Sequence, residues 1–193
     1  MTSLVCLLDG VWNAPEIQDA VTFEAWIAPQ AYPWNWNAIV EQRDRYFFGL
    51  DETGHIGLRV FIDDHWRECV SATQVPLMEW SHIAATVDPN CGLTIYINGQ
   101  EAGRLKISGR FARRRPFEPN EIEDKFFTKR QAAGGAFQIG RNLDELPAAA
   151  TRPIPASYSF DGIIDELKIY ARALDASEIK RSTTLCVPLL RLH

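Results

Sequence analysis

An all-β fold is predicted for this sequence, built from consecutive antiparallel hairpins and followed by one short helix near the C-terminal end. Short runs that favour strands recur along the chain, and turn signals separate them. Helical periodicity is confined to the last segment, whereas an α/β fold would need crossover helices between strands. The 193 residues are 46% hydrophobic and 11% aromatic, which is enough for one substantial core.

Eight runs carry the strand pattern. They are Val21 to Ile27, Tyr46 to Leu50, Gly57 to Ile62, Trp66 to Ala72, Ser81 to Val87, Leu93 to Ile97, Ala136 to Ile139 and Ile163 to Tyr170. Turn signals at Asp51-Glu-Thr-Gly54, Asp88-Pro-Asn-Cys-Gly92 and Asn98-Gly99 join or close these runs. Neighbouring runs are therefore expected to pair as antiparallel hairpins.

The last run predicts a strand that carries a carboxylate among apolar side chains. The strict alternation puts four residues on one face: Ile163, Asp165, Leu167 and Ile169. A buried carboxylate needs backbone hydrogen bonds, a cation or a metal, so Asp165 is a candidate metal ligand. Asp175 and Glu178 then have the spacing of a capping box, which predicts a short helix ending near Arg181.

One domain over residues 1–193 is expected, with its core at about 4–181. Two connections, 108–135 and 141–159, are too long for hairpin turns. The first mixes basic and acidic residues, which favours a solvated excursion, and the second is rich in Pro and Ala, which favours a surface strap.

Charge and hydropathy exclude several classes of partner. A net charge of -5 argues against electrostatic binding of nucleic acid or anionic lipid. No run of about 18 apolar residues is present, so membrane insertion is not expected. The first residues lack the features of a secretory signal, which leaves a cytosolic protein or a module of a longer secreted chain.

The four cysteines do not have the spacing of a zinc or redox motif. They are Cys6, Cys69, Cys91 and Cys186. Cys6 and Cys186 lie near opposite ends of the chain and could form a disulfide if the terminal strands pair. The alternative is free, buried thiols.

The order of motifs resembles the laminin-G-like domains of the concanavalin A-like lectin/glucanase superfamily. The matching segments are Phe23-Glu-Ala-Trp-Ile27, Gly49-Leu-Asp, Gly57-Leu-Arg-Val, Trp80-Ser-His-Ile-Ala-Ala-Thr-Val87, Leu93-Thr-Ile-Tyr-Ile-Asn-Gly99, Phe137-Gln-Ile-Gly140 and Phe160 to Leu174. The resemblance covers roughly residues 4–181 and implies a jelly-roll sandwich of two antiparallel sheets, usually within secreted or surface proteins. It implies no single function, because the fold hosts lectins, spacers, adhesion modules and hydrolases.

The resemblance also implies a structural calcium ion. Carried over by position, its ligands here are Asp165 and Asp9 of Leu7-Leu-Asp-Gly10. Calcium takes several oxygen ligands, which carboxylates and backbone carbonyls supply. The alternative is that Asp165 accepts backbone hydrogen bonds and Asp9 only starts a turn.

Aromatic residues are the candidate ligand contacts. Tyr32-Pro-Trp-Asn-Trp36 is a tryptophan-rich loop that is costly to expose, so it either folds over the sandwich or binds a ligand. Aromatic rings stack on sugar rings while polar groups bond the hydroxyls. The predicted ligand-binding residues are Tyr32, Trp34, Trp36, Arg59, Trp66 and Tyr96. Glu24, Trp26 and His82, which share a face in the alternation, are expected to form a supporting layer.

Catalysis is not expected. Hydrolases of this superfamily carry paired carboxylates on one strand, and Glu121-Ile-Glu-Asp124 lies in the charged excursion without a strand pattern. The predicted function is a non-catalytic carbohydrate-binding or adhesion-type module. It is expected to be an accessory domain of a larger extracellular protein, which could itself be a polysaccharide-degrading enzyme. The alternative is a structural or protein-interaction domain that contacts neighbouring domains and binds no sugar, and a glycoside hydrolase is the third hypothesis.

Overall fold

The computed structural model describes residues 20–33, 36–42, 45–63, 65–107, 137–141 and 160–185. Its strands and helix are β1 (Val21–Pro29), β2 (Asn37–Gln42), β3 (Tyr46–Leu50), β4 (His55–Ile62), β5 (His65–Gln74), β6 (Ser81–Asp88), β7 (Gly92–Ile97), β8 (Gln100–Leu105), β9 (Phe137–Ile139), β10 (Gly162–Tyr170) and α1 (Ala176–Leu185). No helix in these segments is long and apolar enough to cross a membrane.

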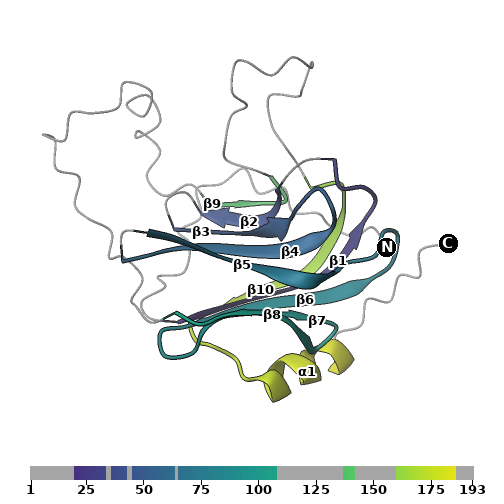
Figure 1. The fold of residues 1–193 in the computed structure, drawn as a ribbon. Helices are drawn as coiled ribbons and strands as arrows, with labels where there is room; N and C mark the ends of the chain where they lie inside the picture. Colours follow the sequence, from purple (N-terminus) through teal and green to yellow (C-terminus); the bar gives the residue numbers. More distant parts are fainter. Residues whose placement is uncertain are drawn as a thin grey trace, which may run out of the picture.

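The strands form a sandwich of two five-stranded antiparallel sheets, as predicted (Figure 1). Sheet A has the order β10-β1-β6-β7-β8, and sheet B has the order β5-β4-β3-β2-β9. The core lies between the sheets because alternate residues of most strands are apolar. Its largest fully buried side chains include Phe23, Ile27, Phe48, Leu58 and Ile95.

The expected turns close the expected hairpins. Asn98 and Gly99 both have positive φ, 50° and 74°, which is the backbone of the tight turn joining β7 to β8. At the β3–β4 turn, the Asp51 carboxylate accepts hydrogen bonds from the amides of Thr53 and His55. The eight strands predicted from sequence are present, and β2 and β8 are additional.

Helix α1 lies against the outside of sheet A, on the side away from sheet B (Figure 1). The predicted capping box forms: Asp175 Oδ1 accepts from the amides of Ser177 and Glu178, and Glu178 Oε2 accepts from the amide of Asp175. The helix runs beyond Arg181 to Leu185. Ile179 and Leu174 pack onto Ala84 and Tyr96 of sheet A.

The alternation expected for β10 is wrong at its centre. A bulge places two residues of β10 opposite one of β1, and Glu166 has φ 52° there. As a result Ile164, Leu167 and Ile169 pack against the core. Asp165 is exposed and does not share the face of Leu167 and Ile169.

Candidate functional site

The two outer faces of the sandwich differ in exposure. On sheet A the outward residues of β1 are buried. The chain leading to α1 covers Thr22, which donates to Arg172 O and accepts from Leu174 N. On sheet B the edge strand β5 exposes most of its residues, including Trp66 at 45% and Val70 at 39%. Among the described strands, the exposed large apolar side chains, Trp66, Val70 and Ile139, all lie on sheet B.

Strand β4 sets the pattern of that face. Its core side carries Ile56, Leu58, Val60 and Ile62, so Gly57, Arg59 and Phe61 point outward. The register of β5 places Val70 opposite Gly57, Glu68 opposite Arg59, and Trp66 opposite Phe61. The outer face thus has an apolar row at each end and a charged row between them.

Trp36 rests on the backbone of β4. A Cβ atom added to Gly57 would lie only 2.0 Å from Cζ3 and 2.4 Å from Cη2 of the indole, so the ring occupies the place of the missing side chain. Phe47 meets the same indole edge-on, with ring centroids 5.7 Å apart. Gly57 and these two rings fix one aromatic end of the face.

The charged row holds the other aromatic end in place. The Arg59 guanidinium lies 5.5 Å from the Trp66 ring centroid, and its Nε is 3.1 Å from Glu68 Oε2. Phe61 packs against Trp66 with centroids 5.4 Å apart at 61°. The indole is therefore oriented by a cation and by an aromatic edge, while almost half of its surface stays open.

We call Trp36, Arg59 and Trp66 the β4 stripe. Flat rings stack on the apolar faces of sugars, and a half-exposed guanidinium donates hydrogen bonds to hydroxyls. The stripe brings together three of the six predicted ligand residues. Sequence reasoning missed their supports, Phe47, Gly57 and Glu68. All three stand in runs that were read only as strands.

Among the described residues, the two glutamates along one row of this face stand far apart in the sheet. One row across sheet B reads Glu68, Arg59, Phe47 and Glu41. Three strand spacings separate Glu68 from Glu41, or roughly 14 Å. The carboxylate pairs of glycosidases stand about 5 to 9.5 Å apart.

Two of the remaining predicted ligand residues, Tyr32 and Tyr96, do not join the stripe. The Tyr32 ring lies over Gly54, beside the β3–β4 turn, and its hydroxyl donates to Val75 O. Tyr96 lies on the outer face of sheet A, is 6% exposed and packs in the cluster beneath α1. Its expected grouping with Arg59 is wrong, because the two residues belong to different sheets. Trp34 lies outside the described residues.

Glu24 and His82 lie buried side by side on sheet A. His82 Nε2 is 2.8 Å from Glu24 Oε1, and the Trp26 ring meets His82 edge-on at 5.3 Å. Burial alone would raise the pKa of Glu24, but hydrogen bonds from His82 and Ser182 lower the pKa below its ordinary value. This arrangement agrees with a supporting layer.

Asp165 by itself does not complete a metal site. Its Oδ1 accepts from the amide of Glu166, 2.9 Å away. Among the described residues, no group of three or more His, Cys, Asp and Glu side chains could hold a metal ion. Calcium needs six to eight oxygen ligands, and Asp9, the second predicted ligand, lies outside the described residues.

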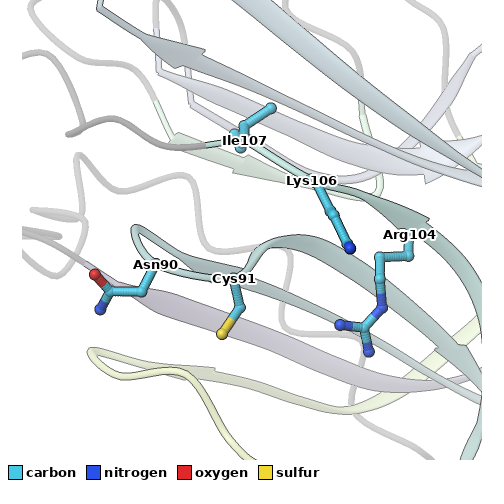
Figure 2. A pocket seen from close by; sticks show the side chains of 5 residues that line it. All are labelled: Asn90, Cys91, Arg104, Lys106 and Ile107. Carbon is cyan, nitrogen blue, oxygen red and sulfur yellow. The ribbon is translucent and has the colours of Figure 1, made fainter.

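A hollow of about 530 Å³ lies at the β6–β7 turn (Figure 2). Asn90 and Cys91 of the turn line it together with Arg104, Lys106 and Ile107. Arg104 is bound by Glu101, with Nε 2.9 Å from Oε1. Because no aromatic ring is among these lining residues, the hollow lacks a stacking surface.

The described cysteines are free thiols. Cys91 is exposed, and Cys69 is buried. Burial raises the pKa of the Cys69 thiol to about 11. Cys6 and Cys186, the predicted disulfide pair, lie outside the described residues.

Comparison with known proteins identifies the family and the fold. A laminin G profile, described as the concanavalin A-like lectin/glucanases superfamily, matches residues 11–180. No protein of curated function matches the chain in sequence.

Three solved structures illustrate the likeness. Domain 4 of AbnA, an extracellular arabinanase from Geobacillus stearothermophilus solved with arabinotriose, is 20% identical with a TM-score of 0.57, covering 86% of this chain and 68% of that one. A putative carbohydrate-binding protein from Bacteroides ovatus is 20% identical with a TM-score of 0.54, covering 84% and 40%. A heptameric SAP-like pentraxin from Limulus polyphemus is 14% identical with a TM-score of 0.52, covering 86% and 71%. At these identities the likeness shows the shared fold.

Proposed function

The chain belongs to the laminin-G-like domains of the concanavalin A-like lectin/glucanase superfamily, and we propose that it is a non-catalytic carbohydrate-binding module whose glycan binds on the β4 stripe. The observation that carries the proposal is the stripe itself. Two partly exposed indoles flank an arginine on the open face of sheet B, and each indole is held by contacts within the sheet. Such an apolar platform with a few polar anchors is suited to sugar rings.

The likeness to other modules supports a carbohydrate ligand. One structural relative is a domain of an arabinanase in complex with arabinotriose, and another is a putative carbohydrate-binding protein. The first relative is also part of an extracellular enzyme. We therefore propose that this module serves in a larger extracellular protein.

Binding of the 193-residue chain to a broad panel of glycans and polysaccharides tests this function. We expect selective binding that Trp66→Ala strongly weakens. Met78→Ala is the matched control, because Met78 is an exposed apolar residue, 55% exposed, at the β5–β6 turn and outside the stripe. Absence of binding across the panel would favour a structural or protein-interaction domain instead.

We also propose that Asp165 is one ligand of a structural calcium ion, together with Asp9. The support is the family resemblance and the exposure of the Asp165 carboxylate, one oxygen of which makes a single hydrogen bond to the Glu166 amide. Bound calcium would fasten Asp9 to the edge strand β10. Its role in this proposal is structural, since Asp165 is on sheet A and the stripe is on sheet B.

A further inference from the structure

We infer that the glycan bound by this module is an extended oligosaccharide that lies along β4, with one sugar unit stacked on Trp36 and another on Trp66. This inference rests on the proposed function and specifies its ligand. A module that captures a single terminal sugar would need one compact pocket. The β4 stripe has two separate indoles, Trp36 and Trp66, on each of which a sugar ring can stack.

The two positions are far apart along the strand. Trp36 rests on Gly57, and Trp66 packs beside Phe61, its partner in register. Gly57 and Phe61 are four residues apart on the same face of β4, which corresponds to roughly 13 Å. A single sugar ring has the size of one aromatic ring and cannot cover both indoles. A chain of several units can.

The residues between the two positions are polar and remain accessible. The side chains of Arg59 and Glu68 are 40% and 43% exposed, although they form an ion pair. A guanidinium has five N–H donors and a carboxylate has about four acceptor positions, so most of them are free for hydroxyl groups. Because the ion pair already fixes both side chains, less conformational entropy is lost when a sugar binds.

The neighbouring strand β5 has the same order of apolar, polar and apolar residues as β4. On β5, Trp66 and Val70 are exposed apolar residues and Glu68 lies between them. Val70 is opposite Gly57, beside the position that Trp36 occupies. The apolar, polar, apolar order therefore runs along both β4 and β5, which matches a linear chain of sugars lying parallel to these strands.

The test is calorimetric titration of the full chain with linear arabino-, xylo- and cello-oligosaccharides of one to six units. We expect at least one series to bind, with affinity that rises about tenfold or more at the length that reaches both indoles and then levels off. Trp66→Ala and Trp36→Ala should each remove this rise and leave weak binding that does not depend on length. The double variant should not bind.

Gly57→Ala provides a second disruption of the Trp36 end that removes no aromatic group. Its methyl group would displace the indole from β4, so we expect the same loss of the length dependence as in Trp36→Ala. Thermal melts of each variant show whether the fold is retained, and Met78→Ala should preserve the full length series. Loss of the length dependence in Met78→Ala would contradict the assignment to the stripe.

The outcomes separate this inference from the proposed function. If a monosaccharide binds as tightly as a hexasaccharide, the inference of an extended ligand is overturned. The proposed carbohydrate-binding function would still stand. If the affinity still rises with oligosaccharide length in both Trp36→Ala and Trp66→Ala, the oligosaccharide binds elsewhere on the protein. That result would also overturn the inference. No binding of any series, nor of any glycan in the panel, would overturn both.

Discussion

At Gly57 the absence of a side chain determines where Trp36 lies. Gly57 is directly opposite Gly49 of β3, where an added Cβ would come within 2.9 Å of the Phe47 ring. Two paired glycines thus let two aromatic rings lie close against the backbone of sheet B. A platform of this kind depends on small residues as much as on the aromatic ones.

Glu68 is expected to act on ligand binding through Arg59. In Glu68→Gln the guanidinium loses its ion pair, so it should hold its place above Trp66 less often, and the affinity for the bound oligosaccharide should fall several-fold. The free energy of unfolding should change by less than about 1 kcal/mol, because both side chains are partly exposed.

Titration calorimetry and chemical unfolding of the same variant measure the two effects. Glu101→Gln is the matched control, since it breaks the exposed Glu101–Arg104 pair of sheet A. An affinity unchanged in Glu68→Gln, or reduced equally in the control, would show that Glu68 does not position Arg59 for the ligand.

Glu24 is expected to make the stability depend on pH in the acidic range. The folded-state pKa of Glu24 lies below its ordinary value of 4.5. The carboxylate therefore contributes stability that is fully present above about pH 4.5 and is lost as the pH falls through the folded-state pKa. Glu24→Gln disturbs the buried hydrogen bond to His82, so we expect it to cost about 1 to 3 kcal/mol at neutral pH.

Urea unfolding of the wild type and Glu24→Gln between pH 7 and pH 3 measures this contribution. The difference in unfolding free energy between the two proteins should shrink towards the acidic end. A difference that stays constant over the whole range would mean that the Glu24 carboxyl titrates alike in the folded and unfolded chain.

Among the elements, α1 packs on the outer face of sheet A. Ile179 is fully buried against sheet A, and the capping box fixes where the helix begins. The pKa of Glu178 is lowered to about 2, chiefly by hydrogen bonds from Arg172 and from the Asp175 amide. The carboxylate therefore stays charged at the first turn of the helix, where negative charge is favourable.

Ile179→Ala should destabilise the protein by about 2 to 5 kcal/mol through the cavity that it leaves. Amide exchange should increase first in α1 and in the sheet A strands beneath it. Sugar binding at saturating ligand should persist under folding conditions, because the stripe lies on sheet B. Ile139→Ala, at an exposed position of β9, serves as the control. Loss of binding in a folded Ile179→Ala protein would contradict the separation of the two faces.

The sequence predicts elements best where apolar alternation and turn chemistry agree. The Asn98-Gly99 turn and the alternating run before it identify β7, but β8 has the sequence Gln100-Glu-Ala-Gly-Arg-Leu105 and lacks apolar alternation. That strand is an edge strand, held by its pairing with β7 and by contact with β5. Such strands leave little signal in their own residues.

The sequence of β10 also gives no sign of its bulge. Nor does any local pattern show that the predicted ligand residues are divided between the two sheets. Asp165 fits the alternation perfectly, so only the pairing with β1 reveals the extra residue. Likewise Arg59 and Tyr96 both point away from the core, but on opposite faces of the sandwich, and strand alternation cannot tell which sheet a strand joins. Trp36, Arg59 and Trp66 are three of the six predicted ligand residues, and only the register of β4 and β5 shows how they are spaced.

For the whole molecule, the two sheets differ in the apolar side chains that they expose, since Trp66, Val70 and Ile139 all belong to sheet B. Glu24, Trp26, His82 and Tyr96 are buried on the outer face of sheet A, where α1 packs onto Ala84 and Tyr96. The polar and aromatic residues of sheet A thereby support the sandwich. On sheet B, Arg59, Trp66 and Glu68 remain partly exposed, and our proposal therefore places the ligand on that sheet.

A structural calcium ion should act on the stability of the whole molecule and leave the stripe unchanged. Any ligand that binds only the folded state stabilises it, by about 2.7 kcal/mol at one hundred times its dissociation constant. We therefore expect calcium to raise the melting temperature by several degrees, chelator to reverse this increase, and Asp165→Ala to abolish the difference.

The same melts with Asp161→Ala provide the control, since Asp161 is an exposed carboxylate just before β10. Elemental analysis of the purified chain detects an ion held too tightly for the chelator to remove. Identical melts with and without chelator, in a chain that contains no calcium, would reject the site. In that case the hydrogen bond from the Glu166 amide would be the role that remains for Asp165 at the bulge.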